Sequence, residues 1–304
     1  MDTDQPLTEK EEDPPIDLSE REQDEVERRQ AAAARVVHEV IRRQGDEELR
    51  RPALSLLWSG VAGGIAISAS LMGKAIIEAH LPPSEWRPLV SSLGYSLGFL
   101  IVVLGRLQLF TESTLSAVIP VATHARPRNL LRLARLWSIV LLANFAGTFI
   151  VALGVHFGLI GTAEGLAAMR ETAREALPHV GWAGVAAAVP AGFLMAAIAW
   201  VLPGGRRQEF WIVLFFTYFI SQGGFAHVVA GSAEVWLLVL GGVLAPVDGV
   251  VTHILPVLFG NIIGGTVLFA TLAHAGVRQE LGSGPHSDDD RDRPAGDRKA
   301  SGRS

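Results

Sequence analysis

One histidine stands inside a long apolar run, where a titratable side chain is costly to bury. The run reads Phe219-Ile-Ser-Gln-Gly223-Gly224-Phe225-Ala-His227-Val, and its paired glycines weaken a helix at that point. Imidazole exchanges a proton near neutral pH, which makes His227 a candidate for a role in a pore. The same histidine could instead join two helices by a structural hydrogen bond.

A second polar segment interrupts another apolar run. Arg106, Gln108 and Glu112 follow Val102-Val-Leu-Gly105, and such residues are costly at membrane depth unless they face a cavity or each other. We expect a chain break in both places, covered by protein or water. The helix start after a break would favour an anion. A tilted helix with its polar residues near the interface, or a structural Arg106–Glu112 ion pair, are the alternatives.

The composition argues against a soluble enzyme. The 304 residues are 49% hydrophobic, and the charges crowd toward the two termini. The absence of cysteine excludes thiolate metal sites, iron–sulfur clusters and cysteine nucleophiles. No nucleophile elbow, phosphate loop or dinucleotide fingerprint occurs, and the histidines near span ends share no metal-ligand spacing. The sequence therefore predicts a membrane protein that is not an enzyme, with no cofactor, metal or nucleic-acid partner.

Six apolar segments are long enough to cross a bilayer. The second and fifth are too long for one crossing, and they hold the two polar segments. Arginine and lysine concentrate in alternate connections, which predicts a multi-pass plasma (inner) membrane protein with both termini in the cytoplasm. The predicted fold class is an all-α membrane protein with six transmembrane helices, at residues 52–73, 88–121, 133–157, 182–202, 209–244 and 251–275.

Three regions follow from this pattern. Residues 1–50 are predicted to be an acidic disordered arm that ends in an amphipathic helix at the membrane interface. A solvated arm that docks on a neighbouring subunit is equally compatible with the sequence. Residues 51–276 form the predicted transmembrane pore domain, and residues 277–304 form a disordered cytoplasmic tail.

The pore domain divides into two related halves, at about residues 52–157 and 182–275. Three crossings in each half would make the second half run in the opposite sense, as in inverted-repeat transporters. The matches, in chain order, are Gly60-Val-Ala-Gly63 with Gly184-Val-Ala-Ala187, Thr111 with His227, and Asn144 with Asn261. The residues expected to support the two breaks are Arg106, Gln108, Glu112, Gly223, Gly224, Asn144 and Asn261.

Three motifs together resemble the signature segments of the formate/nitrite transporter family, in a branch distinct from the well-known formate channels. They are Leu109-Phe110-Thr111, Gly224-Phe225-x-His227 and Ile254-Leu-Pro-x-x-x-Gly260-Asn261-Ile-Ile-Gly264-Gly265. The resemblance implies an aquaporin-like fold, with interrupted second and fifth helices, in a homopentamer with one pore per subunit. It also implies that small monovalent anions such as formate, nitrite, hydrosulfide or lactate cross, often with a proton.

The same resemblance implies a polar pore centre made of Thr111 and His227, between two apolar constrictions. The constriction candidates are Leu109, Phe110, Phe99, Ile220 and Phe225. The family's formate channels carry an acidic residue before the pore histidine and two asparagines near it. This chain has Ala226, Gly231 and Gly192 there, and the region of Glu47 lacks a family lysine.

Two other functions stay open. One is a neutral-solute channel of the aquaporin class, although no Asn-Pro-Ala motif occurs. The other is a non-transporting membrane protein whose acidic N-terminal arm recruits a partner.

Overall fold

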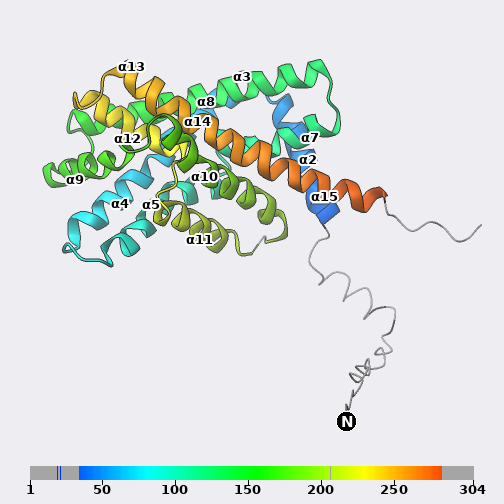
Figure 1. Ribbon diagram of the computed structural model, residues 1–304, viewed down its shortest axis with the longest axis horizontal. Helices are drawn as coiled ribbons and strands as arrows, with labels where there is room; N and C mark the ends of the chain where they lie inside the picture. Colours follow the sequence, from blue (N-terminus) through cyan, green and yellow to red (C-terminus); the bar gives the residue numbers. More distant parts are fainter. Residues whose placement is uncertain (1–18, 20, 22–33, 206, 283–304) are drawn as a thin grey trace, which may run out of the picture.

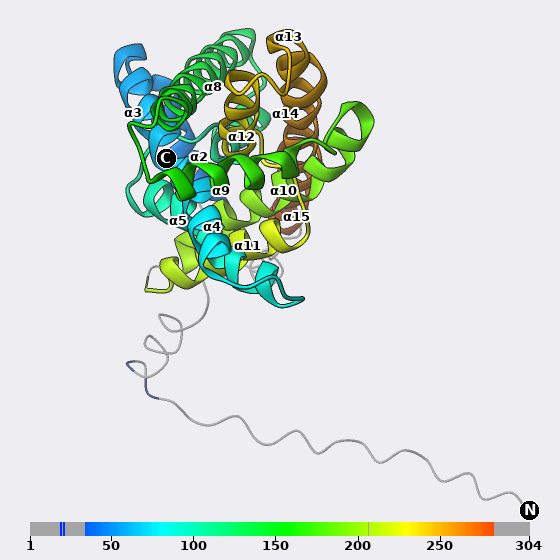
Figure 2. The same ribbon diagram turned by 90° about the vertical axis from the view of Figure 1, so that its left-hand side faces the viewer.

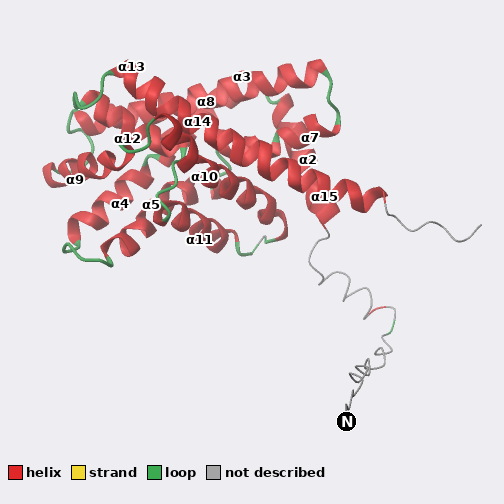
Figure 3. Cartoon of the chain, in the orientation of Figure 1, coloured by secondary structure: helices red, strands yellow, loops and turns green. Residues whose placement is uncertain are grey.

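The structure is a computed structural model that describes residues 34–205 and 207–282, together with the isolated positions 19 and 21. The predicted acidic arm before residue 34 and the predicted tail after residue 282 lie outside these residues. Every regular element in the described part of the chain is a helix, as the colouring of Figure 3 shows. The all-α part of the prediction is therefore confirmed.

Five helical segments are long and apolar enough to cross a membrane. They are Ala53–His80 (α3, Ala53–Ile67, and α4, Ala69–His80), Arg87–Leu104 (α5), Pro127–His156 (α8), Gly181–Gly204 (α10, Gly181–Val201, and one tight turn) and Pro246–Val277. The last comprises α13 (Pro246–Asp248), α14 (Leu255–Ile262), two π-helical stretches (Gly249–Ile254 and Ile263–Ala270) and the start of α15 (Thr271–Gly282). Two shorter apolar helices are α11 (Glu209–Gln222) and α12 (Val228–Leu240).

The outward faces of these helices are apolar, which suits a hydrocarbon surrounding rather than water. Large side chains that point outward include Trp58, Leu142, Trp182, Phe215 and Leu272. The inward faces pack the helices in pairs: α3 against α8, α10 against α14, and α5 against both α4 and α11. Membrane-length helices with apolar exteriors therefore surround a helical core.

Two further helices lie at opposite ends of the molecule. The short helix α9 (Ala163–Ala173) lies at one end of the long axis, and α2 (Ala34–Arg50) lies with α15 toward the other (Figure 1). Figure 2 looks onto the first end and shows α9 crossing in front of the bundle. The helix α15 continues to Gly282, past residue 276 where the sequence placed the end of the pore domain.

The helix α2 packs directly on the bundle. A Cβ atom added to Gly45 would lie 1.9 Å from the carbonyl oxygen of Ser116, at the end of α6 (Phe110–Ser116) and just before α7 (Val118–Thr123). The Ser116 hydroxyl donates a hydrogen bond to Oε2 of Glu48 at 2.8 Å. This helix also buries Val37, Ile41 and Leu49. The last part of the predicted arm therefore contributes to the folded domain.

Two glycines allow very close helix crossings. A Cβ atom on Gly64 of α3 would lie 2.1 Å from the carbonyl oxygen of Asn144 on α8. The same atom on Gly192 of α10 would lie 2.2 Å from the carbonyl oxygen of Asn261 on α14. Small residues let helix backbones approach in this way inside membranes. Both crossings hold an asparagine-bearing helix against a neighbour.

We predict that Gly64→Ala destabilises the protein, because the added methyl group overlaps backbone atoms that cannot move independently. Overpacking of this kind costs about 1–3 kcal/mol. Thermal unfolding of the purified protein in detergent, followed by tryptophan fluorescence, should show a lower midpoint. Gly276→Ala is the control, since its Cβ atom would meet open space; equal midpoints for the two variants would contradict the prediction.

Candidate functional site

The helix α5 ends in a sharp left-handed turn. The Arg106 amide donates to the carbonyl of Val103 at 3.2 Å, and the Leu107 amide donates to the carbonyl of Val102 at 3.0 Å. This pattern is the Schellman end of a helix, which requires one residue with positive φ. Arg106 takes that position with φ 54, at a cost of about 1 kcal/mol because it is not glycine.

The helix α11 ends in the same way. The Gly224 amide donates to the carbonyl of Ser221 at 3.1 Å, and the Phe225 amide donates to the carbonyl of Ile220 at 3.0 Å. Gly224 takes the left-handed position with φ 59. The chain is therefore non-helical from Gly105 to Leu109 and from Gly223 to His227, at the two places where the sequence holds its polar segments.

The Arg106 guanidinium lies 3.5 Å from a carboxylate oxygen of Glu209. The Arg106–Glu112 ion pair considered from the sequence is not formed among the described residues. The left-handed turn directs the arginine toward the start of α11 instead, where its side chain is 75% exposed.

Asn144 of α8 pairs the backbone groups exposed by the first break. Its Oδ1 accepts a hydrogen bond from the Phe110 amide at 3.0 Å. Its Nδ2 donates to the carbonyl of Gln108 at 2.9 Å and to the carbonyl of Gly60 at 2.8 Å. The side chain is completely buried. One amide group therefore connects the start of α6, the break before it and the neighbouring helix α3.

Asn261 of α14 makes the same three contacts at the second break. Its Oδ1 accepts from the Val228 amide at 2.8 Å, and its Nδ2 donates to the carbonyls of Ala226 at 2.9 Å and Ala188 at 2.8 Å. The predicted match of the two asparagines therefore corresponds to a repeated arrangement of hydrogen bonds.

The predicted match between Gly60 and Gly184 is wrong by one helical turn. The carbonyl bound by Asn144 belongs to Gly60, and the carbonyl bound by Asn261 belongs to Ala188. Ala188 lies four residues beyond Gly184 in the sequence, which is about one turn of a helix. Glycine and alanine recur throughout these helices, so short matches between them do not fix a register.

Thr111 and His227 meet at the centre of the bundle. The distance between Thr111 Oγ1 and His227 Nε2 is 2.7 Å, and both side chains are almost completely buried. His227 Nδ1 accepts a hydrogen bond from the Ala230 amide at 3.1 Å. An accepting Nδ1 carries no proton, so the neutral ring has its proton on Nε2 and donates it to the threonine hydroxyl.

The five predicted constriction residues do not all lie against this contact. The ring of Phe99 lies edge-on to His227, with centroids 4.9 Å apart and planes at 82°. Leu109 and Ile220 are buried nearby in the same apolar core. Phe110 packs on Trp137, with ring centroids 5.6 Å apart. Phe225 lines a cavity that also reaches His227.

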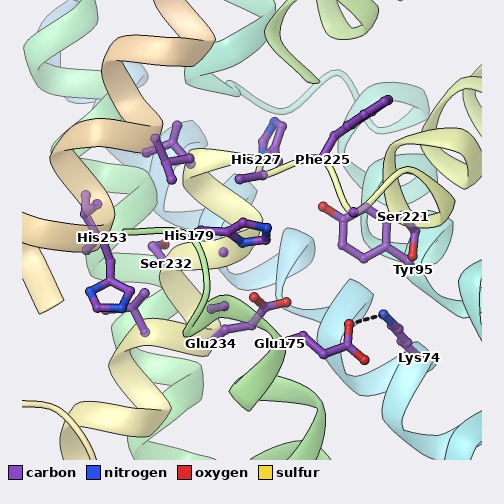
Figure 4. A pocket seen from close by; sticks show the side chains of 18 residues that line it. Lys74, Tyr95, Glu175, His179, Ser221, Phe225, His227, Ser232, Glu234 and His253 are labelled. Carbon is purple, nitrogen blue, oxygen red and sulfur yellow. Dashed lines mark hydrogen bonds and ion pairs between the residues drawn. The ribbon is translucent and has the colours of Figure 1, made fainter. Parts of the chain in front are cut away.

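That cavity, on the α9 side, has a volume of about 70 Å³. Besides His227 and Phe225, its lining includes polar side chains from six separate segments, labelled in Figure 4: Lys74, Tyr95, Glu175, His179, Ser221, Ser232, Glu234 and His253. None of these eight residues is a site candidate from the sequence alone. Lys74 and Glu234 could have been found by the rule that identified Arg106, because both are charged residues inside apolar helices.

A second cavity, of about 320 Å³, lies on the α2 side. Its charged lining consists of Arg106, Glu48, Glu112 and Glu209. Burial raises the pKa of the Glu48 carboxyl, which also receives hydrogen bonds from the side chains of Ser116 and Gln108. Of the residues predicted to support the break, Glu112 lines this cavity, and Gln108 is hydrogen-bonded to Glu48 of its lining.

The described residues define a helical membrane protein in which two non-helical breaks, each paired by an asparagine, meet at a threonine–histidine contact. The sequence profile described as Formate/nitrite transporter matches residues 35–275. The chain belongs to the formate/nitrite transporter family.

Its curated relatives include the inner membrane protein YfdC of Escherichia coli (strain K12), at 36% identity over 84% of this chain and 82% of that protein. The formate channel FocA of Haemophilus influenzae is 24% identical over 72% of this chain and 84% of its own length.

Solved structures show the same fold. A pentameric formate channel with formate bound aligns with a TM-score of 0.61 at 20% identity, covering 75% of this chain and 96% of that one. An FNT family ion channel aligns with a TM-score of 0.63 at 18% identity, covering 80% of this chain and 98% of that one.

We predict that Asn261→Ala lowers the stability of the fold sharply. The substitution leaves the Val228 amide and two carbonyl groups buried without partners. Each such group costs about 1–3 kcal/mol. Thermal unfolding in detergent is the measurement, with Asn129→Ala as a matched control because the hydrogen bond from Asn129 to the carbonyl of His124 lies at the surface. A midpoint for Asn261→Ala that equals the control value would show that the break does not depend on this side chain.

Proposed function

We propose that this protein is a transmembrane channel or transporter for small monovalent anions of the formate and nitrite type, with Thr111 and His227 at the centre of its pore. The single observation that carries the proposal is the 2.7 Å contact between these two side chains, made where both breaks meet. The family and the relative named as a formate channel support the substrate class.

We also propose how the helices cross the membrane. With α5 and α6 as an interrupted second crossing and α11 and α12 as an interrupted fifth, the five long segments and these pieces give six crossings. The repeated hydrogen bonds of Asn144 and Asn261 support an inverted repeat of aquaporin-like type. Six crossings would place both termini on the same side of the membrane, and the basic connections favour the cytoplasm for that side. The inner membrane is the proposed location because the relative YfdC is named for it.

The pentameric formate channel among the similar structures supports a homopentamer. Each subunit would then carry its own pore, because Thr111 and His227 come from one chain. The apolar outer faces of the helices would be shared between neighbouring subunits and the lipid bilayer, which are both partners in this proposal.

The mechanism follows from the two helix starts. Helices α6 and α12 begin directly after the breaks, and a helix start carries partial positive charge that favours an anion. A bare anion loses much of its hydration free energy when it enters the apolar surroundings of Phe99, Leu109 and Ile220. Loss of water raises the proton affinity of the anion itself, so sharing a proton lowers the barrier.

In this scheme His227 can interact with an anion through one ring nitrogen, Nε2. Its Nδ1 is occupied by the Ala230 amide, so the ring acts through the Nε2 proton that Thr111 holds in the resting state. An anion that replaces the threonine hydroxyl would receive this hydrogen bond. Transfer of the proton itself would leave the ring anionic unless Nδ1 first took up a proton and gave up the Ala230 amide. Hydrogen bonding to the anion is therefore the resting function of the ring, and proton transfer requires that second step.

We predict that His227→Asn changes the pH dependence of formate flux, because asparagine keeps a donor for Thr111 but cannot take up the second proton on which proton transfer by the ring depends. His227→Phe removes the donor as well and should reduce flux about tenfold or more, the effect of losing one charge-assisted hydrogen bond. Stopped-flow measurement on purified protein in liposomes gives both values.

His80→Asn is the control, since His80 is exposed and its ring is hydrogen-bonded to the carbonyl of Ile76. A pH profile of His227→Asn identical to that of the unaltered protein would contradict the proposed role of the ring. Flux of glycerol or water without formate flux would replace the proposal with a neutral-solute channel. Loss of formate flux on deletion of residues 1–30 would assign a necessary role to the acidic arm.

A further inference from the structure

The start of α8 is rich in arginine and has no acidic residue near it in the sequence. Its arginines are Arg126, Arg128, Arg132 and Arg135. No aspartate or glutamate occurs from residue 113 to residue 163. The ion pairs within the described part of the chain are made by other basic residues, namely Arg42, Arg43, Lys74, Arg106 and Arg174. These four arginines are therefore positive charges without a carboxylate partner among the described residues.

The helix α8 is longer than a membrane crossing needs. Its 30 residues extend about 45 Å at 1.5 Å per residue, whereas the hydrocarbon core of a bilayer is about 30 Å thick. The neighbouring helix α3 runs in the same direction, because Gly60 lies against Ala143 and Gly64 lies against Gly147. In this register the first turns of α8 continue past the start of α3, toward the headgroup region of the membrane.

A hydrogen bond adds a further arginine to this group. The Arg135 side chain donates to the carbonyl of Arg51 at 2.7 Å. The guanidinium of Arg51 in turn donates to the Ser55 hydroxyl of α3 at 3.3 Å. Glu48 is close enough to act on Arg51, but burial raises the pKa of its carboxyl, which favours the uncharged form. Arg51, Arg128, Arg132 and Arg135 are called the arginine cluster below.

The α8 members of the arginine cluster share one face of the helix with an apolar side chain. Arg128, Leu131, Arg132 and Arg135 are spaced as i, i+3, i+4 and i+7, which places them along a single stripe. Arg128 and Arg135 are exposed and Arg132 is half-buried, while Leu131 is 72% exposed. Guanidinium groups and an uncovered leucine therefore point the same way.

The helix α3 continues this surface with apolar residues. Leu54 and Trp58, one helical turn apart, are 63% and 65% exposed. Both lie within two turns of Arg51. Tryptophan at such a position is typical of the boundary between headgroups and hydrocarbon. The arginine cluster therefore lies above an apolar surface of two packed helices, at the level where a phospholipid has its phosphate.

We infer that the arginine cluster binds an anionic phospholipid, with the phosphate held by the guanidinium groups and the acyl chains lying along α3 and α8. The inference goes beyond the proposed transport of anions and does not depend on it.

The chemistry of the surface favours a lipid over other anions. A guanidinium group donates two parallel hydrogen bonds to phosphate oxygens, and basic clusters at the ends of transmembrane helices attract anionic headgroups. Free phosphate would gain nothing from the exposed Leu54, Trp58 and Leu131. The acidic residues within positions 1–30 are another source of negative charge, but a strongly acidic segment would leave the same three apolar side chains uncovered.

The test is native mass spectrometry of the purified full-length protein in a neutral detergent, titrated with phosphatidylglycerol or phosphatidylcholine of identical acyl chains. We expect phosphatidylglycerol to bind at least about tenfold more tightly. Combining Arg128→Gln with Arg132→Gln should weaken phosphatidylglycerol binding about tenfold or more, because each arginine contributes to the attraction of an anionic headgroup. Binding of phosphatidylcholine should change little.

Arg170→Gln is the matched control, because it removes an exposed arginine of α9 at the opposite end of the molecule. Equal affinity for the two lipids, unchanged phosphatidylglycerol binding in the double variant, or an equal loss in Arg170→Gln would each overturn the inference. Displacement of phosphatidylglycerol by inorganic phosphate would overturn it in favour of a soluble anion. A preference for phosphatidylglycerol that appears only after deletion of residues 1–30 would overturn it in favour of the acidic arm.

Discussion

A chain break inside an apolar bundle exposes backbone groups that cannot find water, and the fold of this protein depends on how those groups are paired. Two buried asparagines, Asn144 and Asn261, each accept a hydrogen bond from one backbone amide and donate hydrogen bonds to two backbone carbonyls. An amide side chain is suited to this task because it offers an acceptor and two donors on one rigid plane. Without such pairing, each break would carry several buried unsatisfied groups and would revert to continuous helix or open to solvent.

The pairing has a functional consequence because it fixes where the next helices begin. Each break closes with the same left-handed turn, made by Arg106 in one half and Gly224 in the other. The turn and the asparagine together aim the starts of α6 and α12 at one point, where Thr111 and His227 come into contact. The left-handed turn is sterically less favourable for Arg106 than for a glycine, and the Arg106 side chain forms an ion pair with Glu209. Local backbone geometry therefore produces the central contact.

Much of this arrangement could be predicted from local features of the sequence. Polar residues in apolar runs located the breaks, and the spacing of Asn144 and Asn261 from them indicated a repeated support. The register of Gly60 could not be predicted, because glycine and alanine are too frequent to align uniquely. The cavity residues, among them Lys74, His179 and Glu234, were missed for a different reason. They come from distant segments, and only the packing of α4, α9 and α12 brings them together.

The charges on either side of the central contact constrain how this chain can select an ion. On the α2 side Arg106 lines a cavity with Glu48, Glu112 and Glu209. On the α9 side Lys74 is paired with Glu175, and Glu234 forms no ion pair with a described residue. Neither approach is therefore made attractive to an anion by excess lysine or arginine. A helix start contributes only about half a positive charge, which a single ionised carboxylate outweighs at equal distance. Protonation of these carboxyl groups would therefore ease the approach of an anion to His227.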